Sequence, residues 1–188
     1  MADPRLIVAW ALFVFVVLSG YLFLSGLIWG SGWAPTPRKQ LDAAASLLQL
    51  REGDTVYDLG SGFGNALIFF AKRYHVSAIG VEVDPLRCWI ARRDARRKGV
   101  ATAVTVRRGN LMDVDLKQSS KVFFFLSPFL MRRLQEKVGR EMPEGGLVVS
   151  VEHRFPDWAP VESVENVHLY LVGRNSKPTG TKNEPDGR

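Results

Sequence analysis

The hydropathy pattern opens with an apolar run from Leu6 to Trp29 that contains no Asp, Glu, Lys, Arg or His. A helix rises 1.5 Å per residue, so a helix of this length crosses the ~30 Å hydrocarbon core of a bilayer. The run is longer than the apolar core of a secretory signal peptide, which has about 7–15 residues. It also leads into Trp29 and Trp33, and tryptophan is enriched at membrane interfaces. We therefore expect residues 1–36 to form an uncleaved membrane anchor and its exit.

Behind this run, short apolar segments alternate with amphipathic ones. A helix is expected to begin at Thr36, whose hydroxyl suits an N-cap, with Pro37 at its first position, and to end near Leu50. The same pattern predicts helices at 66–73, 85–98 and 130–142, and strands at 55–59, 77–81, 103–107, 122–126 and 147–151. Less regular segments at 161–164 and 168–172 predict a closing pair of strands.

Strands separated by helices predict an α/β fold with a doubly wound, mostly parallel sheet of seven strands. The segment Val122–Leu126 contains no polar residue, as expected for a central strand that is buried on both faces. Residues 37–173 suffice for one domain with a single core. The polar segment 174–188 has no apolar pattern, so we expect a disordered tail.

The cysteine count and the charges indicate where this domain lies. Cys88 is the only cysteine among 188 residues, so the chain can form neither an intramolecular disulfide nor a multi-cysteine zinc site. No metal site is predicted. Arg38 and Lys39 follow the apolar run, and basic residues favour the cytoplasmic side of a membrane helix. We expect a single-pass membrane protein whose domain faces a reducing, cytosol-like compartment.

The net charge of +6 arises partly from basic residues in and after the predicted helix 85–98, which are Arg87, Arg92, Arg93, Arg96, Arg97, Lys98, Arg107 and Arg108. Asp84 is an acceptable N-cap for this helix, and Pro85 suits its first turn. Leu86, Trp89 and Ile90 are expected to face inward, so the arginines form a solvated outer face. Contact with anionic lipid headgroups is the second interpretation. Nucleic acid binding, which a basic chain also suggests, ranks third.

Candidate chemistry lies at the turn after the first predicted strand, Asp58-Leu59-Gly60-Ser61-Gly62-Phe63-Gly64. Three alternate glycines permit a tight turn and let a ligand lie against the backbone. Glu82 ends the next strand, about 20 residues on, where a carboxylate accepts hydrogen bonds from the hydroxyls of a ribose. A dinucleotide site would need a third glycine where Asn65 stands. The sequence therefore predicts a ribose-containing ligand other than a nicotinamide or flavin dinucleotide.

Together with Val81-Glu82-Val83-Asp84-Pro85, this turn resembles the S-adenosylmethionine site of class I methyltransferases, whose fold is Rossmann-like. The resemblance covers roughly Val56–Val172 and implies S-adenosyl-L-methionine as the cofactor. It implies that the glycine turn passes beneath the methionine part, that Glu82 holds the ribose and that Asn110 meets the adenine amino group. The cofactor-binding residues implied are Asp58, Gly60, Ser61, Gly62, Gly64, Glu82 and Asn110.

A narrower resemblance rests on Thr36-Pro37, Phe125-Leu126-Ser127-Pro128 and the segment 154–160, which reads RFPDWAP. With the anchor, these segments resemble the small membrane-anchored protein lysine methyltransferases of mitochondria and their soluble archaeal relatives. The chain departs from that family at Phe63 and Asn65, where Asp and Arg are usual. The resemblance implies methyl transfer to a lysine of a protein at or near the membrane, and a domain on the cytosolic or mitochondrial matrix side.

Methylation of a lysine needs a neutral amine, although the pKa of an unperturbed lysine is about 10.4. An apolar slot favours the neutral amine, and aromatic faces stabilise the diffuse positive charge of the transfer. We expect Ser127 and Trp158 to be catalytic and Pro128, Phe129 and Phe155 to bind substrate, because they follow the fourth and fifth strands. Packing in the core is the alternative for the three aromatic residues.

Two further polar residues, Glu152 and His153, follow the fifth strand. Glu152 is a candidate catalytic residue that orients the amine or accepts its proton, and His153 is a weaker candidate for the same role. Enzymes that methylate adenine or glutamine carry N-P-P-Y where this chain has Leu126-Ser127-Pro128-Phe129. A cytosine C5 methyltransferase would need a reactive thiol, and nothing near Cys88 marks it as one.

Two other functions are compatible with the same sequence. The first is a methyltransferase for a small molecule or a lipid. The second is a non-catalytic, membrane-anchored module that keeps the cofactor fold and binds an anionic lipid through its basic helix. An intact glycine turn together with Glu82 favours an enzyme, because a module without catalysis needs neither.

Overall fold

The computed structural model describes residues 3–29 and 34–173, and the chain divides into two compact units, Met1–Ala34 and Pro35–Arg188. Trp33 and the expected tail 174–188 lie outside the described residues. The apolar run forms helix α1 (Pro4–Trp29). Among the described residues, α1 is the one helix long and apolar enough to cross a membrane.

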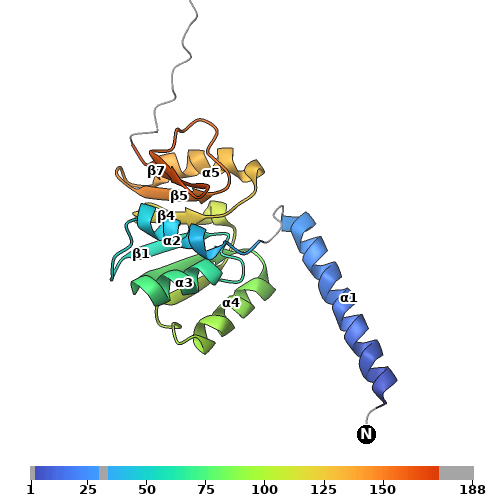
Figure 1. Ribbon diagram of the computed structural model, residues 1–188. Coiled ribbons are helices and arrows are strands. Elements are labelled where there is room, and N and C mark those ends of the chain that lie inside the picture. The colour runs from blue at the N-terminus through green and yellow to red at the C-terminus, as the bar shows by residue number, and fades with distance from the viewer. Residues whose placement is uncertain (1–2, 30–33, 174–188) are drawn as a thin grey trace, which may run out of the picture. The chain divides into compact units, whose positions relative to one another are not determined.

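In the second unit, seven strands form one sheet in the order β3-β2-β1-β4-β5-β7-β6 (Figure 1). The strands are β1 (Thr55–Leu59), β2 (Ser77–Glu82), β3 (Val104–Arg108), β4 (Lys121–Phe124), β5 (Leu147–Val151), β6 (Glu162–Val164) and β7 (Val167–Leu171). The first five are parallel, whereas β7 is antiparallel to both β5 and β6. The predicted doubly wound, mostly parallel sheet is confirmed.

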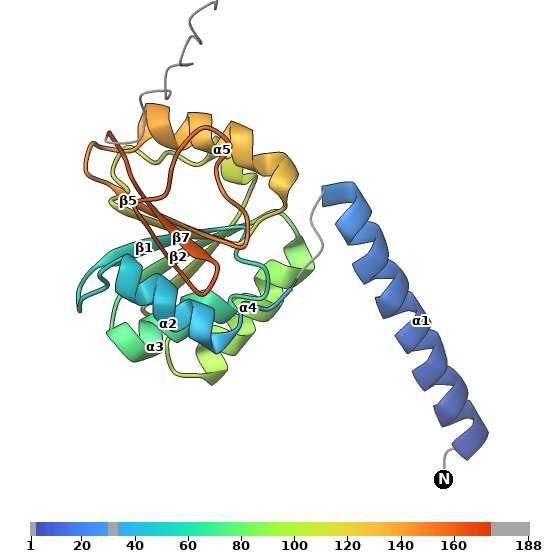
Figure 2. The same cartoon turned by 45° about the horizontal axis from the view of Figure 1, so that its top comes forward.

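Helices cover both faces of this sheet (Figure 2). On one face lie α2 (Arg38–Leu47), α3 (Asn65–Tyr74) and α4 (Pro85–Arg97), and on the other lies α5 (Pro128–Glu141). A short 3₁₀ helix, η1 (Leu111–Asp113), was not expected. In the central strand β4, Phe123 packs on the side of α3 and Phe124 on the side of α5, and both are at most 1% exposed. The predicted burial of this strand on both faces is confirmed.

The expected start of the first domain helix is wrong by one residue. Pro37, not Thr36, occupies the N-cap position of α2. The backbone of Pro37 is extended, with φ −58° and ψ 147°, and its carbonyl accepts a hydrogen bond from the N–H of Leu41 at 3.1 Å. The Thr36 hydroxyl therefore has no capping role.

The expectation that Trp89 faces inward is also wrong, because the buried residues of α4 are Arg87, Cys88, Ala91 and Ala95. The expected solvated face of arginines therefore does not include Arg87, which is 4% exposed and forms an ion pair with Asp84. This helix passes close to the glycine turn, so a Cβ atom on Gly64 would lie 2.9 Å from the Cβ atom of Ala91. A bulky side chain has no room in that contact. Trp89 is 54% exposed, and the guanidinium of Arg93 lies 5.7 Å from the centroid of its ring.

Phe155 and Trp158 belong to the core on the α5 side of the sheet, where they are 3% and 8% exposed. The ring centroid of Phe155 lies 4.7 Å from that of Tyr170 and 5.4 Å from that of Trp158. Trp158 also covers Gly139 of α5, where an added Cβ atom would lie 2.9 Å from Cζ2 of the indole. The burial of both side chains favours packing over the predicted roles in substrate binding and catalysis.

Replacing Trp158 by alanine should therefore destabilise the domain. Trp158→Ala removes the aromatic contacts to Phe155 and Tyr170 and leaves a cavity over Gly139, so we expect a loss of about 3–5 kcal/mol in the free energy of unfolding. Urea unfolding of the full chain measures this loss. Trp89→Ala is the matched control, because Trp89 is exposed, and it should cost less than about 1 kcal/mol. Equal stabilities of the two variants would contradict the packing role.

Candidate active site

The predicted site residues lie at or just after the carboxyl ends of five strands, β3, β2, β1, β4 and β5, which are consecutive neighbours in the sheet. Because these strands are parallel, their carboxyl ends lie at the same edge. The chain leaves β1 toward α3 on one face and leaves the adjacent β4 toward α5 on the other. This edge between β1 and β4 is thus a topological switch point, where open α/β sheets bind their ligands.

The glycine turn (Gly60–Gly64) needs glycine at three positions. Gly60, Gly62 and Gly64 have φ values of 83°, 53° and 76°, in the left-handed region that other residues rarely adopt. A Cβ atom on Gly60 would in addition lie 2.6 Å from Cδ2 of Leu126, in the loop after β4. Glycine therefore serves both the backbone conformation and the close packing of this turn against the neighbouring loop.

Glu82 connects the glycine turn to the loop before α4. Its buried carboxylate accepts a hydrogen bond from the N–H of Gly62 at 2.8 Å through Oε2 and one from the N–H of Asp84 at 3.0 Å through Oε1. A carboxylate has about four lone-pair sites, so about two remain for other donors. The two hydroxyls of a ribose fit that requirement.

Gly80, in β2, is a residue that the sequence reasoning missed. A Cβ atom at this position would lie 2.6 Å from Oγ of Ser61. The Ser61 hydroxyl is buried beside Gly80, and no partner for it is found among the described residues. The side chain of Ser61 is thus turned toward β2, so any contact of Ser61 with a cofactor falls to its backbone. A glycine inside a strand indicates such a close approach and was the available signal.

Asp58 and Glu82 form a pair of buried carboxylates, 3% and 5% exposed. Burial raises the pKa of Asp58 from 3.8 to about 8, and the neighbouring carboxylate of Glu82 adds to this rise. No basic side chain of the described residues counteracts the shift. Because unpaired buried carboxylates are unfavourable, this pair favours a cationic ligand. S-adenosylmethionine carries an ammonium and a sulfonium group, so the residues at this edge fit it.

Asn110, predicted to meet the adenine, follows β3 and caps η1. Its Oδ1 accepts a hydrogen bond from the N–H of Met112 at 3.0 Å, and the side chain is exposed. A carbonyl oxygen has a second lone pair, so Asn110 can accept from an adenine amino group while it caps η1. Its role in cofactor binding stays a prediction.

The predicted catalytic residue Ser127 and the predicted substrate residues Pro128 and Phe129 lie where the loop after β4 leads into α5. Ser127 is the N-cap residue of α5, and its carbonyl accepts a hydrogen bond from the N–H of Leu130 at 3.1 Å. Pro128 occupies the first turn of that helix, and Phe129 is 88% exposed. Among the three aromatic residues predicted for the substrate slot, Phe129 alone is accessible.

Glu152, at the end of β5, is fixed by residues from two distant parts of the chain. Its φ of 65° is uncommon for a residue other than glycine. Its carboxylate accepts hydrogen bonds from the side chain of Gln40 in α2, at 2.5 Å, and from that of Asn166, at 3.4 Å. Gln40 also donates to the carbonyl of Glu165, in the turn between β6 and β7. Gln40 and Asn166 were missed, and a glutamine inside a helix carries no signal of such a role.

The remaining candidates have weaker grounds for a chemical role. Cys88 is buried, its Sγ donates a hydrogen bond to the carbonyl of Glu82 at 3.3 Å, and burial raises its pKa. A raised pKa disfavours the thiolate, so Cys88 is poorly suited to be a nucleophile. His153 is half-buried, and its backbone N–H donates to the carbonyl of Val151 at 2.8 Å.

Residues 58–162 match the family model described as the ANTKMT methyltransferase domain. The chain belongs to this methyltransferase family. The matched segment contains Asp58, the glycine turn, Glu82 and Glu152, whose roles in the site stay predictions. The resemblance to class I methyltransferases is thereby confirmed.

Individual relatives agree with this assignment. The methyltransferase is 30% identical over 152 residues to a protein-lysine N-methyltransferase of Saccharolobus islandicus, covering 76% of this chain and 94% of that protein. It is 31% identical over 154 residues to a human lysine N-methyltransferase named for a subunit of the ATP synthase, covering 78% of this chain and 65% of that protein. It is 34% identical over 145 residues to the mouse adenine nucleotide translocase lysine N-methyltransferase, covering 75% of this chain and 62% of that protein. The chain thus spans somewhat less than two thirds of the two mammalian proteins.

A solved structure with a bound cofactor product has the same fold. The crystal structure of an RNA methyltransferase from Salinibacter ruber, in complex with S-adenosyl-L-homocysteine, is similar with a TM-score of 0.72 and 29% identity. The match covers 82% of this chain and all of that chain. S-adenosyl-L-methionine is therefore the cofactor of this methyltransferase.

The substitution Glu82→Gln should weaken cofactor binding. An amide nitrogen cannot accept a hydrogen bond, so the variant loses an acceptor at the ribose position or at the glycine turn. A hydrogen bond to a charged group contributes about 1.5–3 kcal/mol, so the affinity for S-adenosylhomocysteine should fall at least about tenfold. Isothermal titration calorimetry of the full chain measures it, with the exposed Glu162→Gln as the matched control. An unchanged affinity in Glu82→Gln would remove Glu82 from the cofactor site.

The substitution Asp58→Asn should change how stability depends on pH. The pKa of Asp58 is about 8 in the folded domain against 3.8 ordinarily, so between these values the folded state binds a proton that the unfolded state has lost. The stability of the cofactor-free domain therefore falls as pH rises through this window, by up to about 1.4 kcal/mol per pH unit. Asp58→Asn should remove this contribution. Urea unfolding at several pH values between about 5 and 8 tests the prediction, and parallel pH profiles of variant and parent would contradict it.

Proposed function

We propose that this chain is a membrane-anchored enzyme that transfers the methyl group of S-adenosylmethionine to a lysine side chain of a protein. The three relatives described above are each named for lysine methylation of a protein. The archaeal relative supports the proposal best, because the match covers 94% of its length.

One arrangement at the sheet edge carries the proposal. The buried pair Asp58 and Glu82 favours a cationic cofactor beside β1, while the 88% exposed Phe129 follows the adjacent strand β4. The adjacent ends of β1 and β4 thus combine a cofactor site with an accessible aromatic face. The methyl donor carries a positive charge, which spreads onto the lysine nitrogen as the methyl group is transferred, and these residues suit that diffuse charge.

Different residues of this chain then bind the cofactor, bind the lysine and orient its amine. The glycine turn, Asp58, Glu82 and Asn110 hold the cofactor, which supplies a methyl group on a positively charged sulfur. Phe129 and Pro128 contact the stem of the lysine and limit its hydration, which favours the neutral amine. Ser127 and Glu152, at the ends of the neighbouring strands β4 and β5, orient the amine through oxygen atoms. The fixed position of Glu152 between Gln40 and Asn166 suits such an orienting role.

The anchor makes membrane neighbours the preferred substrates. Helix α1 has 26 residues, which is enough to span a bilayer. With Arg38 and Lys39 behind it, the catalytic domain lies on the cytosolic or mitochondrial matrix side. Tethering raises the effective concentration of the domain for proteins in the same membrane.

Labelled methyl transfer tests the proposal. The full chain in membranes, supplied with S-adenosylmethionine carrying a labelled methyl group, should label a protein band from which acid hydrolysis releases methyl-lysine. Glu82→Gln should abolish most of this labelling. Label found in lipid or in a small molecule would contradict lysine methylation, and so would label in RNA, which the Salinibacter protein is named for.

The variant Phe129→Ala separates substrate binding from cofactor binding. It removes the exposed aromatic face and leaves the glycine turn intact, so protein labelling should fall about tenfold or more while the affinity for S-adenosylhomocysteine changes less than about twofold. Trp89→Ala removes another exposed aromatic residue, on α4 rather than after β4, and should retain full labelling. Equal labelling by the two variants would exclude Phe129 from the substrate site.

A further inference from the structure

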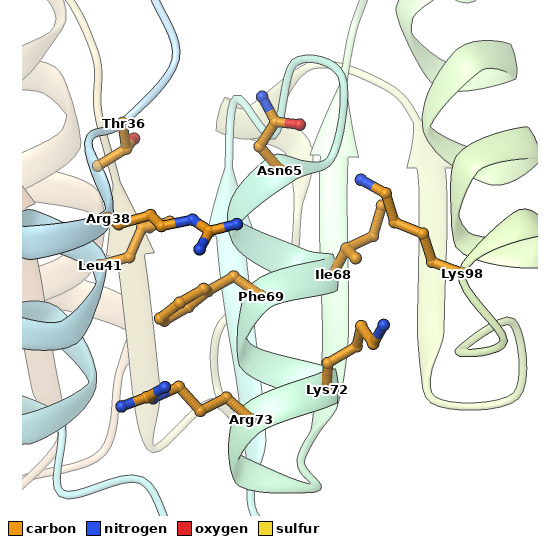
Figure 3. A pocket seen from close by; sticks show the side chains of 9 residues that line it. All are labelled: Thr36, Arg38, Leu41, Asn65, Ile68, Phe69, Lys72, Arg73 and Lys98. Atoms are coloured by element: carbon orange, nitrogen blue, oxygen red, sulfur yellow. The ribbon is translucent and has the colours of Figure 1, made fainter.

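A basic groove lies along the outer surface of α3, from Asn65, the residue after the glycine turn, to Lys72 and Arg73 near the other end of the helix. It has a volume of about 610 Å³. Figure 3 shows Arg38 of α2 on one side, Lys72 and Arg73 of α3 along the groove, and Lys98, the residue after α4, on the other side. We call this cavity with its four cationic side chains the basic groove.

Between these cations, the wall of the basic groove is apolar. Leu41 and Ile68 are 3% and 4% exposed, and Phe69 is half-buried between α2 and α3. Thr36 and Asn65 add a hydroxyl and an amide at the end of the groove where α2 and α3 begin (Figure 3). An apolar wall beside polar and cationic groups is suited to an amphipathic ligand with an acidic head.

Among the residues that the structure describes, no acidic side chain lines the basic groove. Arg73 forms an ion pair with Asp42, from Nε to Oδ1 at 3.2 Å, and both side chains are largely exposed. Within the described part of the chain, no ion pair is found for Arg38, Lys72 or Lys98. Like charges that surround one cavity repel each other, so an anion in the groove lowers this repulsion.

The chain segment that joins the anchor to the first residue of the basic groove is short. Helix α1 ends at Trp29, and Thr36, which lines the groove, follows seven residues later. A fully extended chain of that length reaches at most about 25 Å. An anchor that spans a bilayer tethers the domain to the membrane, where phospholipid headgroups are the most abundant anions of an anionic leaflet.

We propose that the basic groove binds the headgroup of an anionic phospholipid. The phosphate lies among Lys72, Lys98 and Arg38, and the adjoining apolar part of the lipid contacts the half-buried Phe69. The methyltransferase activity does not require this site. The bound lipid places the domain against the membrane and neutralises the charge of the groove.

Native mass spectrometry of the full chain released from nonionic detergent tests the proposal. Phosphatidylglycerol, phosphatidylcholine and inorganic phosphate are offered at equal concentration. We expect one bound phosphatidylglycerol, at an occupancy at least about tenfold above that of phosphatidylcholine, which carries no net charge. Equal occupancy by the two lipids would overturn the proposal, and binding of inorganic phosphate as strongly as of phosphatidylglycerol would overturn the assignment to a lipid.

Matched charge reversals locate the site. The double variant Lys72→Glu with Lys98→Glu should reduce phosphatidylglycerol occupancy at least about tenfold, because it reverses two charges of the groove. The control Lys117→Glu with Arg133→Glu makes the same change of net charge at exposed residues outside the groove, and its occupancy should stay within about twofold of the parent. Equal losses in both double variants would show a general charge effect and overturn the groove as the site.

The same samples keep this inference separate from the proposed function. If the parent chain methylates no protein but still binds phosphatidylglycerol, lysine methylation is contradicted and the lipid site in the basic groove is retained. Loss of a single-stranded RNA oligonucleotide, but not of phosphatidylglycerol, from the Lys72→Glu, Lys98→Glu variant would assign the groove to nucleic acid and overturn the lipid proposal.

Discussion

The candidate active site depends on the hydrogen bonds that the carboxylate of Glu82 accepts. This carboxylate joins two loops, because it accepts hydrogen bonds from Gly62 after β1 and from Asp84 after β2. This bridge is possible because β1 and β2 are parallel and release both loops at the same edge. The same buried charge contributes to the raised pKa of Asp58. Glu82 therefore fixes the shape of the glycine turn, and its carboxylate makes the site more favourable for a cationic ligand.

The parts of the fold that depend on local pattern could be predicted from the sequence. The expected bounds of β1 and β5 match those observed, because each is a short apolar run bounded by polar or glycine residues. The glycine turn was found for a similar reason, since left-handed φ values at alternate positions require glycine. These features depend on steric limits within a few consecutive residues.

The packing of individual side chains depends on partners that are remote in the sequence, so it was predicted less well. Trp89 and Trp158 are the same residue type with opposite outcomes. Gly139 leaves space for Trp158, whereas the contact of Gly64 with Ala91 leaves none for a large side chain at that point of α4. The hydrogen bond from the side chain of Gln40 to that of Glu152 joins residues 112 positions apart in the sequence. No pattern along the chain encodes such a pair. It forms only when α2 and the end of β5 are brought together by the completed sheet.

Net charge alone describes this molecule poorly, because its charges are segregated. Asp58, Glu82 and Glu152 lie at the active edge, whereas the basic groove lies over the outer surface of α3. The total of +6 would by itself repel a lysine-bearing substrate at long range. The carboxylates of Glu82 and Glu152 counteract this repulsion locally, at the edge where cofactor and substrate are proposed to bind. An anionic lipid in the basic groove would reduce the remaining repulsion, so the two proposed sites complement each other without sharing a residue.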